Sequence, residues 1–258
     1  MSYVGVWRGQ NRGSVEAVDS LNKRFERVEQ LRAHEYVAEQ IRRQIALRLI
    51  PSGEALPPER ELAKIFGVGR ATVQQALRLL EADRLVETRR GRHGGTFVIG
   101  LVDEVGMDYL LVELRRDRGL IEETLAYRRS VEPATAAEAA VVHTEAELVT
   151  IRDACQQAAT AESDAAFMTH DTRFHLAIAK ASHNRFFSEA VEKVRLVLNR
   201  AFLALPESAL WHKRSATEHA AVFAALEARD SAAARQAMLI HVDYTQKSVA
   251  ALLAALRP

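Results

Sequence analysis

The first part of the chain changes its pattern of apolar and polar positions several times between His34 and Ile99. Apolar residues recur at helical spacing in three stretches, and two short β-like runs follow. A Pro-Ser-Gly segment at 51–53 ends the first helix, and the Gly-Val-Gly segment at 67–69 is short enough to be a helix–helix corner. The predicted elements are helices at 35–50, 59–66 and 70–82 and strands at 85–88 and 96–99.

The second part of the chain, from about residue 106 onward, shows no strand pattern. Glycine is almost absent there, whereas alanine and leucine are frequent, a composition typical of a helical bundle. The apolar spacing predicts six or seven helices, near 107–116, 119–142, 145–161, 163–181, 184–204, 208–229 and 231–256.

The third predicted helix has one apolar face and one face of hydrogen-bonding side chains. The apolar face begins at Val73 and repeats at i+3, i+4 and i+7. The opposite face carries Arg70, Gln74, Gln75 and Arg78. A helix, a corner and a polar helix followed by a hairpin match a winged helix-turn-helix, whose third helix enters the DNA major groove. The predicted fold is therefore mainly α, with an N-terminal winged helix-turn-helix and a C-terminal all-α helical bundle.

The side chains of this segment suit DNA. Arg70 can contact phosphate or guanine, the glutamines and Arg78 can reach base edges, and Arg60 lies near the start of the second helix, where it can hold phosphate. The predicted hairpin tip has three glycines and three arginines and can bring its backbone close to a phosphate chain. The alternative is a merely solvated polar helix face. That alternative would leave three features as coincidences: the Pro-Pro pair at 57–58 before the second helix, the glycine corner at 67–69, and the glycines and arginines of the hairpin tip.

Charge separates the two parts of the chain. The formal net charge is +1, yet residues 1–100 hold 17 basic and 12 acidic side chains, so the remainder is acidic. This asymmetry fits a nucleic-acid-binding module joined to a partner domain that does not bind nucleic acid. Residues 1–33 form a polar, basic arm that either touches DNA phosphates or is solvated.

The sequence carries no membrane or secretion signal. The first residues lack the apolar core of a signal peptide, and no run is long enough to span a membrane. Cys155 is the single cysteine, so it cannot form an internal disulfide. We therefore expect a cytoplasmic protein without a membrane partner.

Four side chains of the helical half have the chemistry of metal ligands. Asp171 and His175 are four residues apart and share one face of a helix, while His219 and His241 lie on two later helices. If these helices converge, the set suits zinc or another first-row divalent metal. Spacing alone does not show convergence, and each histidine taken singly is also explained as an ordinary structural residue.

The stretch LPPERELAKIFGVGRATVQQALRLLEADRLVETRRGRHGGTFV resembles the DNA-binding domain of the GntR family, with the similarity covering residues 35–98. The resemblance implies that Arg60, Arg70, the helix face around Gln74, and Gly94 and Gly95 of the wing contact DNA. Two positions depart from the family pattern. Gly69 stands where a Ser or Thr N-cap is usual, and Gln74 stands where arginine is common. Because arginine reads guanine and glutamine reads adenine, the operator is expected to differ from the usual half-site.

Residues from about 107 to 256 resemble the FCD effector domain of the FadR-type GntR subgroup, through YRRSVEPATAAEAA, DTRFHLAIAKASHN, EHAAVFAALEARD and ARQAMLIHV. The resemblance implies that Asp171, His175, His219 and His241 bind the metal and that Arg128 holds an acidic effector in the same cavity. The alternative for Arg128 is a helix salt bridge with Glu132. The expected organisation is an arm at 1–33, the DNA-binding domain at 34–99, a linker at 100–106 and an effector-binding and dimerisation domain at 107–258.

These features together predict a transcription repressor. We expect a homodimer that binds an inverted repeat of double-stranded operator DNA and responds to a small carboxylate effector. An Asp/His₃ metal site also occurs in hydrolytic and oxygen-activating enzymes, but no general base or nucleophile pattern accompanies it here. An architectural DNA-binding protein is the other alternative, although dimerisation alone does not require so large a helical half with a polar cluster.

Overall fold

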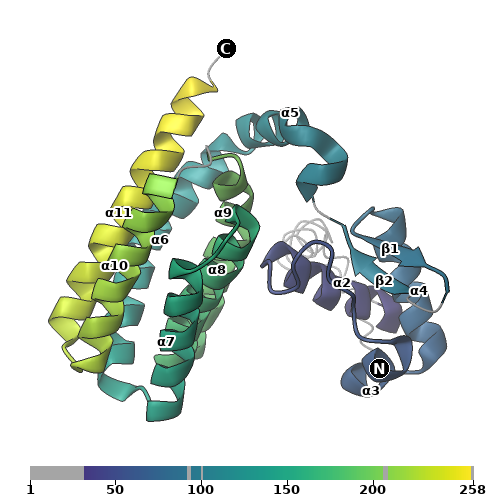
Figure 1. Cartoon of the computed structure of the whole chain (residues 1–258), viewed down its shortest axis with the longest axis horizontal. Helices are drawn as coiled ribbons and strands as arrows, with labels where there is room; N and C mark the ends of the chain where they lie inside the picture. The colour runs from purple at the N-terminus through teal and green to yellow at the C-terminus, as the bar shows by residue number, and fades with distance from the viewer. Residues whose placement is uncertain (1–31, 92–93, 100, 206–208, 257–258) are drawn as a thin grey trace, which may run out of the picture.

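The computed structural model describes residues 32–91, 94–99, 101–205 and 209–256. The predicted basic arm at 1–33 therefore lies almost entirely outside the described residues. Figure 1 shows a small group of elements, α2 to β2, beside a bundle of longer helices, with α5 running from one to the other.

The N-terminal elements are α2 (Ala33–Ala46), α3 (Glu59–Phe66), α4 (Arg70–Ala82), β1 (Val86–Arg89) and β2 (Gly95–Val98). Gly67 ends α3 in the left-handed region at φ 64°, a backbone conformation that glycine adopts without steric cost. The two strands pair antiparallel with Val86 opposite Val98. The sequence did not predict a further bridge, in which Ala55, before α3, pairs with Phe97 and extends the hairpin by one short segment.

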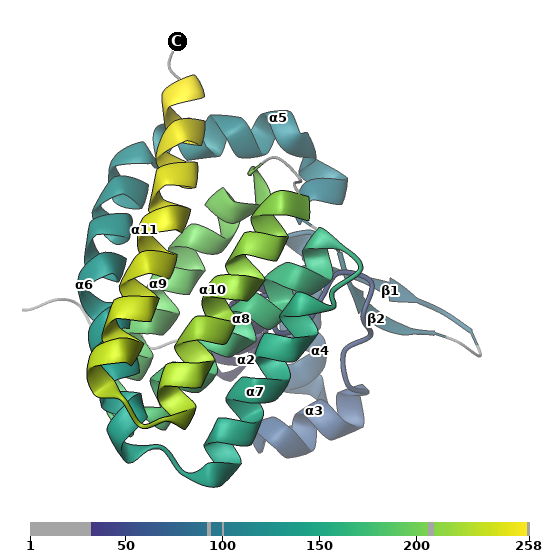
Figure 2. The same ribbon diagram turned by 60° about the vertical axis from the view of Figure 1, so that its left-hand side comes forward.

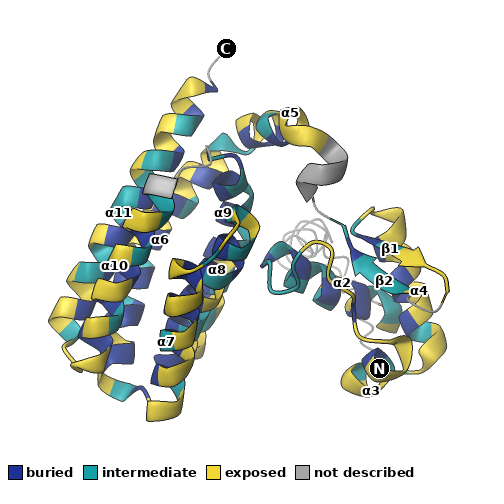
Figure 3. Cartoon of the chain, viewed as in Figure 1, coloured by how far each residue is buried: buried dark blue, intermediate teal, exposed yellow. Residues whose placement is uncertain are grey.

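One apolar core holds these elements together. Val73, Ala76 and Leu80 of α4 are fully buried against Val37 and Ile41 of α2. This is the apolar face that the periodicity of residues 70–82 predicts, so the opposite face of α4 is left in solvent (Figure 3).

The C-terminal part consists of helices within the described residues. Their bounds are α5 (Leu101–Arg116), α6 (Arg118–Val142), α7 (Glu145–Ala159), α8 (Asp164–Ala181), α9 (Arg185–Leu203), α10 (Ala209–Glu227) and α11 (Ser231–Ala255). The segment expected as a linker at 100–106 differs from a plain loop, because α5 begins at Leu101 and is interrupted at Gly106 (φ 73°, ψ 155°). Gly106 tolerates that positive φ, which breaks the helix without ending it.

Two apolar clusters fill the bundle and leave a polar centre. One cluster contains Ile151, Phe174 and Val222, and the other contains Ile121, Phe167 and Leu198. In Figure 2, α6, α8, α9, α10 and α11 run close together. The buried charged and imidazole-bearing side chains that these helices supply are Arg128, Glu132, Asp171, His175, Arg195, His219 and His241. None of the described helices has the length and apolar character needed to cross a membrane.

Candidate functional site

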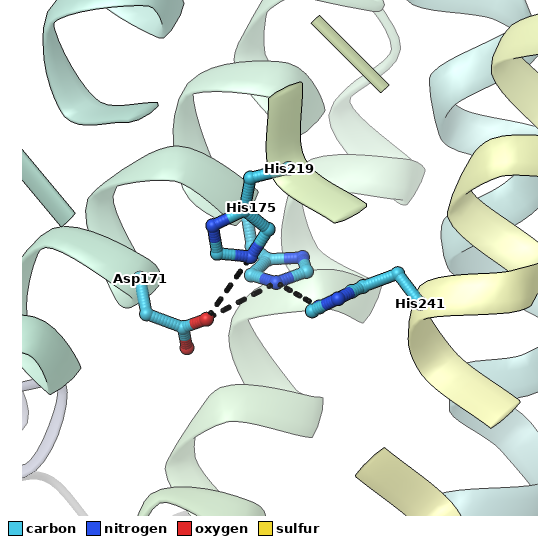
Figure 4. A group of neighbouring side chains, drawn as sticks. All are labelled: Asp171, His175, His219 and His241. Carbon is cyan, nitrogen blue, oxygen red and sulfur yellow. Dashed lines mark hydrogen bonds and ion pairs between the residues drawn. The ribbon is translucent and has the colours of Figure 1, made fainter. Parts of the chain in front are cut away.

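Three helices bring four metal-ligand side chains to one point inside the bundle (Figure 4). Asp171 and His175 come from α8, His219 from α10 and His241 from α11. Each residue offers one ligand atom, and these four atoms lie within 4.8 Å of one another. All four residues are buried. The structure therefore supplies the convergence that spacing alone could not establish.

The individual distances show which atoms meet. Nε2 of His219 lies 3.3 Å from Oδ1 of Asp171, and Nε2 of His175 lies 3.7 Å from the same oxygen. Nε2 of His241 lies 3.2 Å from Nε2 of His175. Two neutral imidazoles cannot both donate along one line, whereas both can present lone pairs to a shared cation. The three Nε2 atoms and Oδ1 therefore form a donor set that could hold a divalent metal.

Two further carboxylates lie beside the Nδ1 atoms of His175 and His241, on the side of each ring opposite the cluster. Oε2 of Glu132 lies 2.7 Å from Nδ1 of His175, and Oε2 of Glu218 lies 3.3 Å from Nδ1 of His241. A proton on Nδ1 facing a carboxylate leaves the Nε2 lone pair free for a metal, as is usual for metal-ligating histidines. Phe174 stacks on the His219 ring with centroids 4.3 Å apart and limits its rotation.

The electrostatics of the cluster favour neutral His219 and His241 and ionised Asp171 and Glu132. Burial lowers the pKa of His219 and, together with the neighbouring His219 and His175 rings, lowers the pKa of His241 well below its ordinary value. Burial by itself raises the pKa of Asp171, but Arg195 and the histidines outweigh it and hold that pKa well below the usual range. Burial likewise opposes ionisation of Glu132, and Arg128 and His175 bring its pKa below normal. These are the protonation states that a metal requires of its ligands.

The donor set fits a first-row divalent ion. Zinc is bound by imidazole nitrogen and carboxylate oxygen at about 2.0–2.2 Å. The ligand atoms of one zinc ion are therefore only a few ångströms apart, as these four atoms are. Asp171, His175, His219 and His241 would hold the ion, which would supply a Lewis-acidic centre able to accept an oxygen donor.

Arg128 lies in the same centre, 1% exposed. Its Nε donates to Oε1 of Glu132 at 2.8 Å, so the salt bridge weighed as the alternative is present. The remaining guanidinium nitrogens are not used by that pair. Nη2 lies 3.5 Å from Nε2 of His175, and Nη1 is buried with no hydrogen-bond partner among the described residues. Arg128 therefore forms the helix salt bridge and still has a donor available beside the metal ligands.

Arg195 of α9 is a site residue that the sequence did not single out. It is fully buried, and its Nη2 donates to Oδ2 of Asp171 at 2.5 Å and to Oγ1 of Thr172 at 2.8 Å. Glu218 was also missed as the partner of His241. Arg195 is a charged residue on the otherwise apolar face of the helix predicted at 184–204, and that pattern could have drawn attention to it.

The predicted DNA-contacting side chains lie exposed on α3 and α4. Arg60 is at the start of α3, and Arg70, Gln74, Gln75 and Arg78 lie along α4. Gln74 is not free in the absence of DNA, because its Nε2 donates to Oε2 of Glu59 at 2.8 Å. Gly69 occupies the N-cap of α4 and provides no side-chain cap, as the family departure predicts.

The wing requires glycine at one of the two predicted positions for a structural reason. A Cβ atom on Gly94 would lie 2.5 Å from the Arg89 carbonyl oxygen and 2.9 Å from that of Gly91. A Cβ on Gly95 would meet only the Phe97 ring, at 3.5 Å. Gly94 is thus needed for the turn itself, whatever it contacts.

Comparison with known proteins matches both parts of the chain. Residues 33–98 match the family of bacterial regulatory proteins named gntR, and residues 123–244 match the FCD domain. A transcription regulator of Escherichia coli named for the Uxu operon is 32% identical over 199 residues, covering 74% of this chain and 76% of the relative. LutR, a transcriptional regulator of Bacillus subtilis, is 30% identical and covers 74% of this chain and 89% of the relative.

A third relative, an Escherichia coli protein named for the L-lactate dehydrogenase operon, is 30% identical, covering 84% of this chain and 86% of the relative. The chain belongs to the GntR family of bacterial transcription regulators, in the FadR-type subgroup that carries an FCD effector domain. It is a DNA-binding regulator with an effector-binding domain, and the domains and relatives confirm the expectation that it is not an enzyme.

Proposed function

We propose that this protein is a repressor whose operator binding is relieved when a small carboxylate binds a zinc-containing site in the helical domain. The observation that carries this proposal is the buried donor set of Asp171, His175, His219 and His241, with an unused Arg128 nitrogen beside it. Zinc would bind one oxygen of the effector's carboxylate, and the Arg128 guanidinium, a good carboxylate partner, would hold the other oxygen of the same group.

The relatives support the class of effector and leave the direction of regulation to experiment. One relative is named for an L-lactate dehydrogenase operon, and lactate is a carboxylate. NanR of Citrobacter rodentium, 27% identical, is named as a repressor, whereas a 26% identical relative is named as an activator of the Glc operon. Expression of a reporter behind the operator, with and without the protein, distinguishes the two modes.

The DNA interface is proposed to use Arg60, Arg70, Gln74, Gln75 and Arg78 of α3 and α4, with the backbone at Gly94 and Gly95 of the wing. Their exposure on one side of a helix-turn-helix supports this assignment. A homodimer on an inverted repeat is proposed because one recognition helix and one wing cover too few base pairs for operator-grade specificity.

The metal arm of the proposal is tested with His219→Ala. Wild-type protein purified without chelator should contain about one zinc per chain by elemental analysis, and the variant should lose most of it because one of four ligands is gone. Ser188→Ala, a change on α9 away from the four ligands, is the control and should retain zinc. Wild-type protein that contains no divalent metal and takes up none from zinc buffer would contradict the proposal.

A further inference from the structure

Arg195 occupies a position that the metal ligands alone do not explain. Only Nη2 of its guanidinium is used, for Asp171 and Thr172. Nε and Nη1 are buried and have no hydrogen-bond partner among the described residues. A buried guanidinium with two unsatisfied nitrogens is costly, so a ligand that accepts from them would be strongly favoured.

Arg195 and Arg128 line the same part of the bundle from two helices. Their guanidinium carbons lie 5.2 Å and 5.6 Å from the centre of one ring, that of Phe202. Each has an unpartnered Nη1 atom. The site therefore has two separate guanidinium groups with donors available, and the sequence resemblance accounts for only one of them.

The buried charges also require a second anion. Arg128 and Glu132 cancel, as do Arg195 and Asp171. Glu218, beside His241, is paired with Arg214, and metal-bound imidazoles are neutral. A divalent ion then leaves two positive charges uncompensated in a buried centre, which is unfavourable without matching anions. A monocarboxylate supplies one negative charge, whereas a dicarboxylate supplies both.

Beside its ion pair with Asp171, Arg195 has a further positively charged neighbour. Arg48, at the end of α2, has its pKa lowered to about 10 by burial and by the neighbouring Arg195. No described carboxylate is hydrogen-bonded or ion-paired with Arg48. The Arg195 side of the centre is thus short of negative charge even before a metal is added.

We propose that Arg195 forms a second anion subsite, so that the effector carries two anionic groups, one for the metal and Arg128 and one for Arg195. This rests on the proposed carboxylate-sensing function and narrows the class of ligand to dianions such as short dicarboxylates. Arg195 serves at the same time to hold Asp171, which leaves Oδ1 of that residue for the metal.

Matched acids test the inference by calorimetry on the zinc-loaded full-length protein. L-Malate is L-lactate with one methyl hydrogen replaced by a carboxylate, and malonate is related to acetate in the same way. We expect each dicarboxylate to bind about tenfold or more tightly than its monocarboxylate, since a charge-assisted contact of this kind is worth about that ratio. In Arg195→Gln the ratio should fall toward one. In Arg200→Gln, a control five residues further along α9, the ratio should stay at its wild-type value.

The possible outcomes separate the two proposals. Equal affinity of wild type for both members of each pair, or an unchanged ratio in Arg195→Gln, overturns the second subsite while leaving the carboxylate-sensing function standing. Absence of binding by all four acids removes both. Because Arg195→Gln can also disturb Asp171, zinc content is measured on the same samples. Arg195→Lys keeps the positive charge, so its ratio of dicarboxylate to monocarboxylate affinity should be intermediate.

Discussion

Gln74 is the residue at which the recognition helix departs from its family, and its neighbour Glu59 determines how its amide is held. A carboxylate only accepts hydrogen bonds, so the Gln74 amide nitrogen faces Glu59 and the amide oxygen faces away. One N–H of the amide and its oxygen remain available, and these are the atoms that pair with adenine N7 and N6. We therefore propose that Glu59 orients Gln74 for adenine.

Substitution at two positions of α4 separates base reading from positioning. Gln74→Arg should shift preference toward guanine at one operator position, with discrimination of about 1–3 kcal/mol per base pair. Arg70→Ala should weaken binding to all sequences alike, because a phosphate contact carries no base information. Selection from a randomised operator library measures both, with Lys193→Ala on α9 as a control. Recovery of the same consensus by wild type and Gln74→Arg would contradict the assignment of Gln74.

The ligand residues show what a sequence can and cannot predict at this scale. The i,i+4 spacing places Asp171 and His175 on one face of α8, and that pair is visible without a structure. The meeting of α8, α10 and α11 depends on helix packing, as do the contacts of Glu218 and Arg195, which are many residues from their partners. No local periodicity encodes those contacts. The resemblance pointed to the four candidate ligands, and the structure added the neighbouring carboxylates Glu132 and Glu218 and the second arginine, Arg195.

Helix α9 touches both the cluster of Asp171, His175, His219 and His241 and the DNA-binding domain. Glu192, Arg195 and Asn199 follow one another at three- and four-residue steps, so they share a face. Arg195 contacts the ligand Asp171, Glu192 forms an ion pair with Arg43 of α2, and Asn199 Nδ2 donates to the Ala46 carbonyl oxygen at 3.3 Å. A shift of α9 on effector binding would therefore be felt at the end of α2.

Removing the contacts of Glu192 and Asn199 with α2 should reduce the change in operator affinity that the effector causes, without loss of the metal. In Glu192→Gln and in Asn199→Ala we expect the coupling between carboxylate and operator binding to change by about 0.5–2 kcal/mol, with zinc content unaltered. Glu189→Gln, an exposed change on the same helix, is the matched control. The measurement is operator affinity with and without L-malate by fluorescence anisotropy. A response in both variants equal to that of Glu189→Gln would exclude α9 as the connection.

Element boundaries in this protein follow local signals where these are strong. The predicted ranges of α3 and α4 agree with the structure because Pro58, Gly67 and Gly69 mark their ends. The bridge at Ala55 was missed since a single paired residue has no periodicity, and α5 starts earlier than predicted because residues 101–105 show no amphipathic stripe.

At the scale of the whole molecule, we expect operator binding to require two DNA-binding domains, one from each protomer of a dimer. We expect a dimer in solution, measured by light scattering on a size-exclusion column, and protection of two inverted half-sites in a footprint. Half-sites about one helical turn apart would match two recognition helices related by a two-fold axis. Protection of a single unrepeated half-site by a monomer would contradict this arrangement.

Metal-dependent sensing is tested by measuring the operator affinity of the full-length protein in four states: zinc-loaded or chelator-stripped, each with and without a saturating carboxylate. An effector shifts an equilibrium only through its different affinity for two states, and a typical coupling of about 1–3 kcal/mol corresponds to a 5- to 150-fold change. We predict that carboxylate lowers the operator affinity of the zinc-loaded protein within this range and leaves that of the stripped protein unchanged. An equal loss of affinity with and without zinc would show that the Asp171, His175, His219 and His241 centre does not sense the effector through a metal.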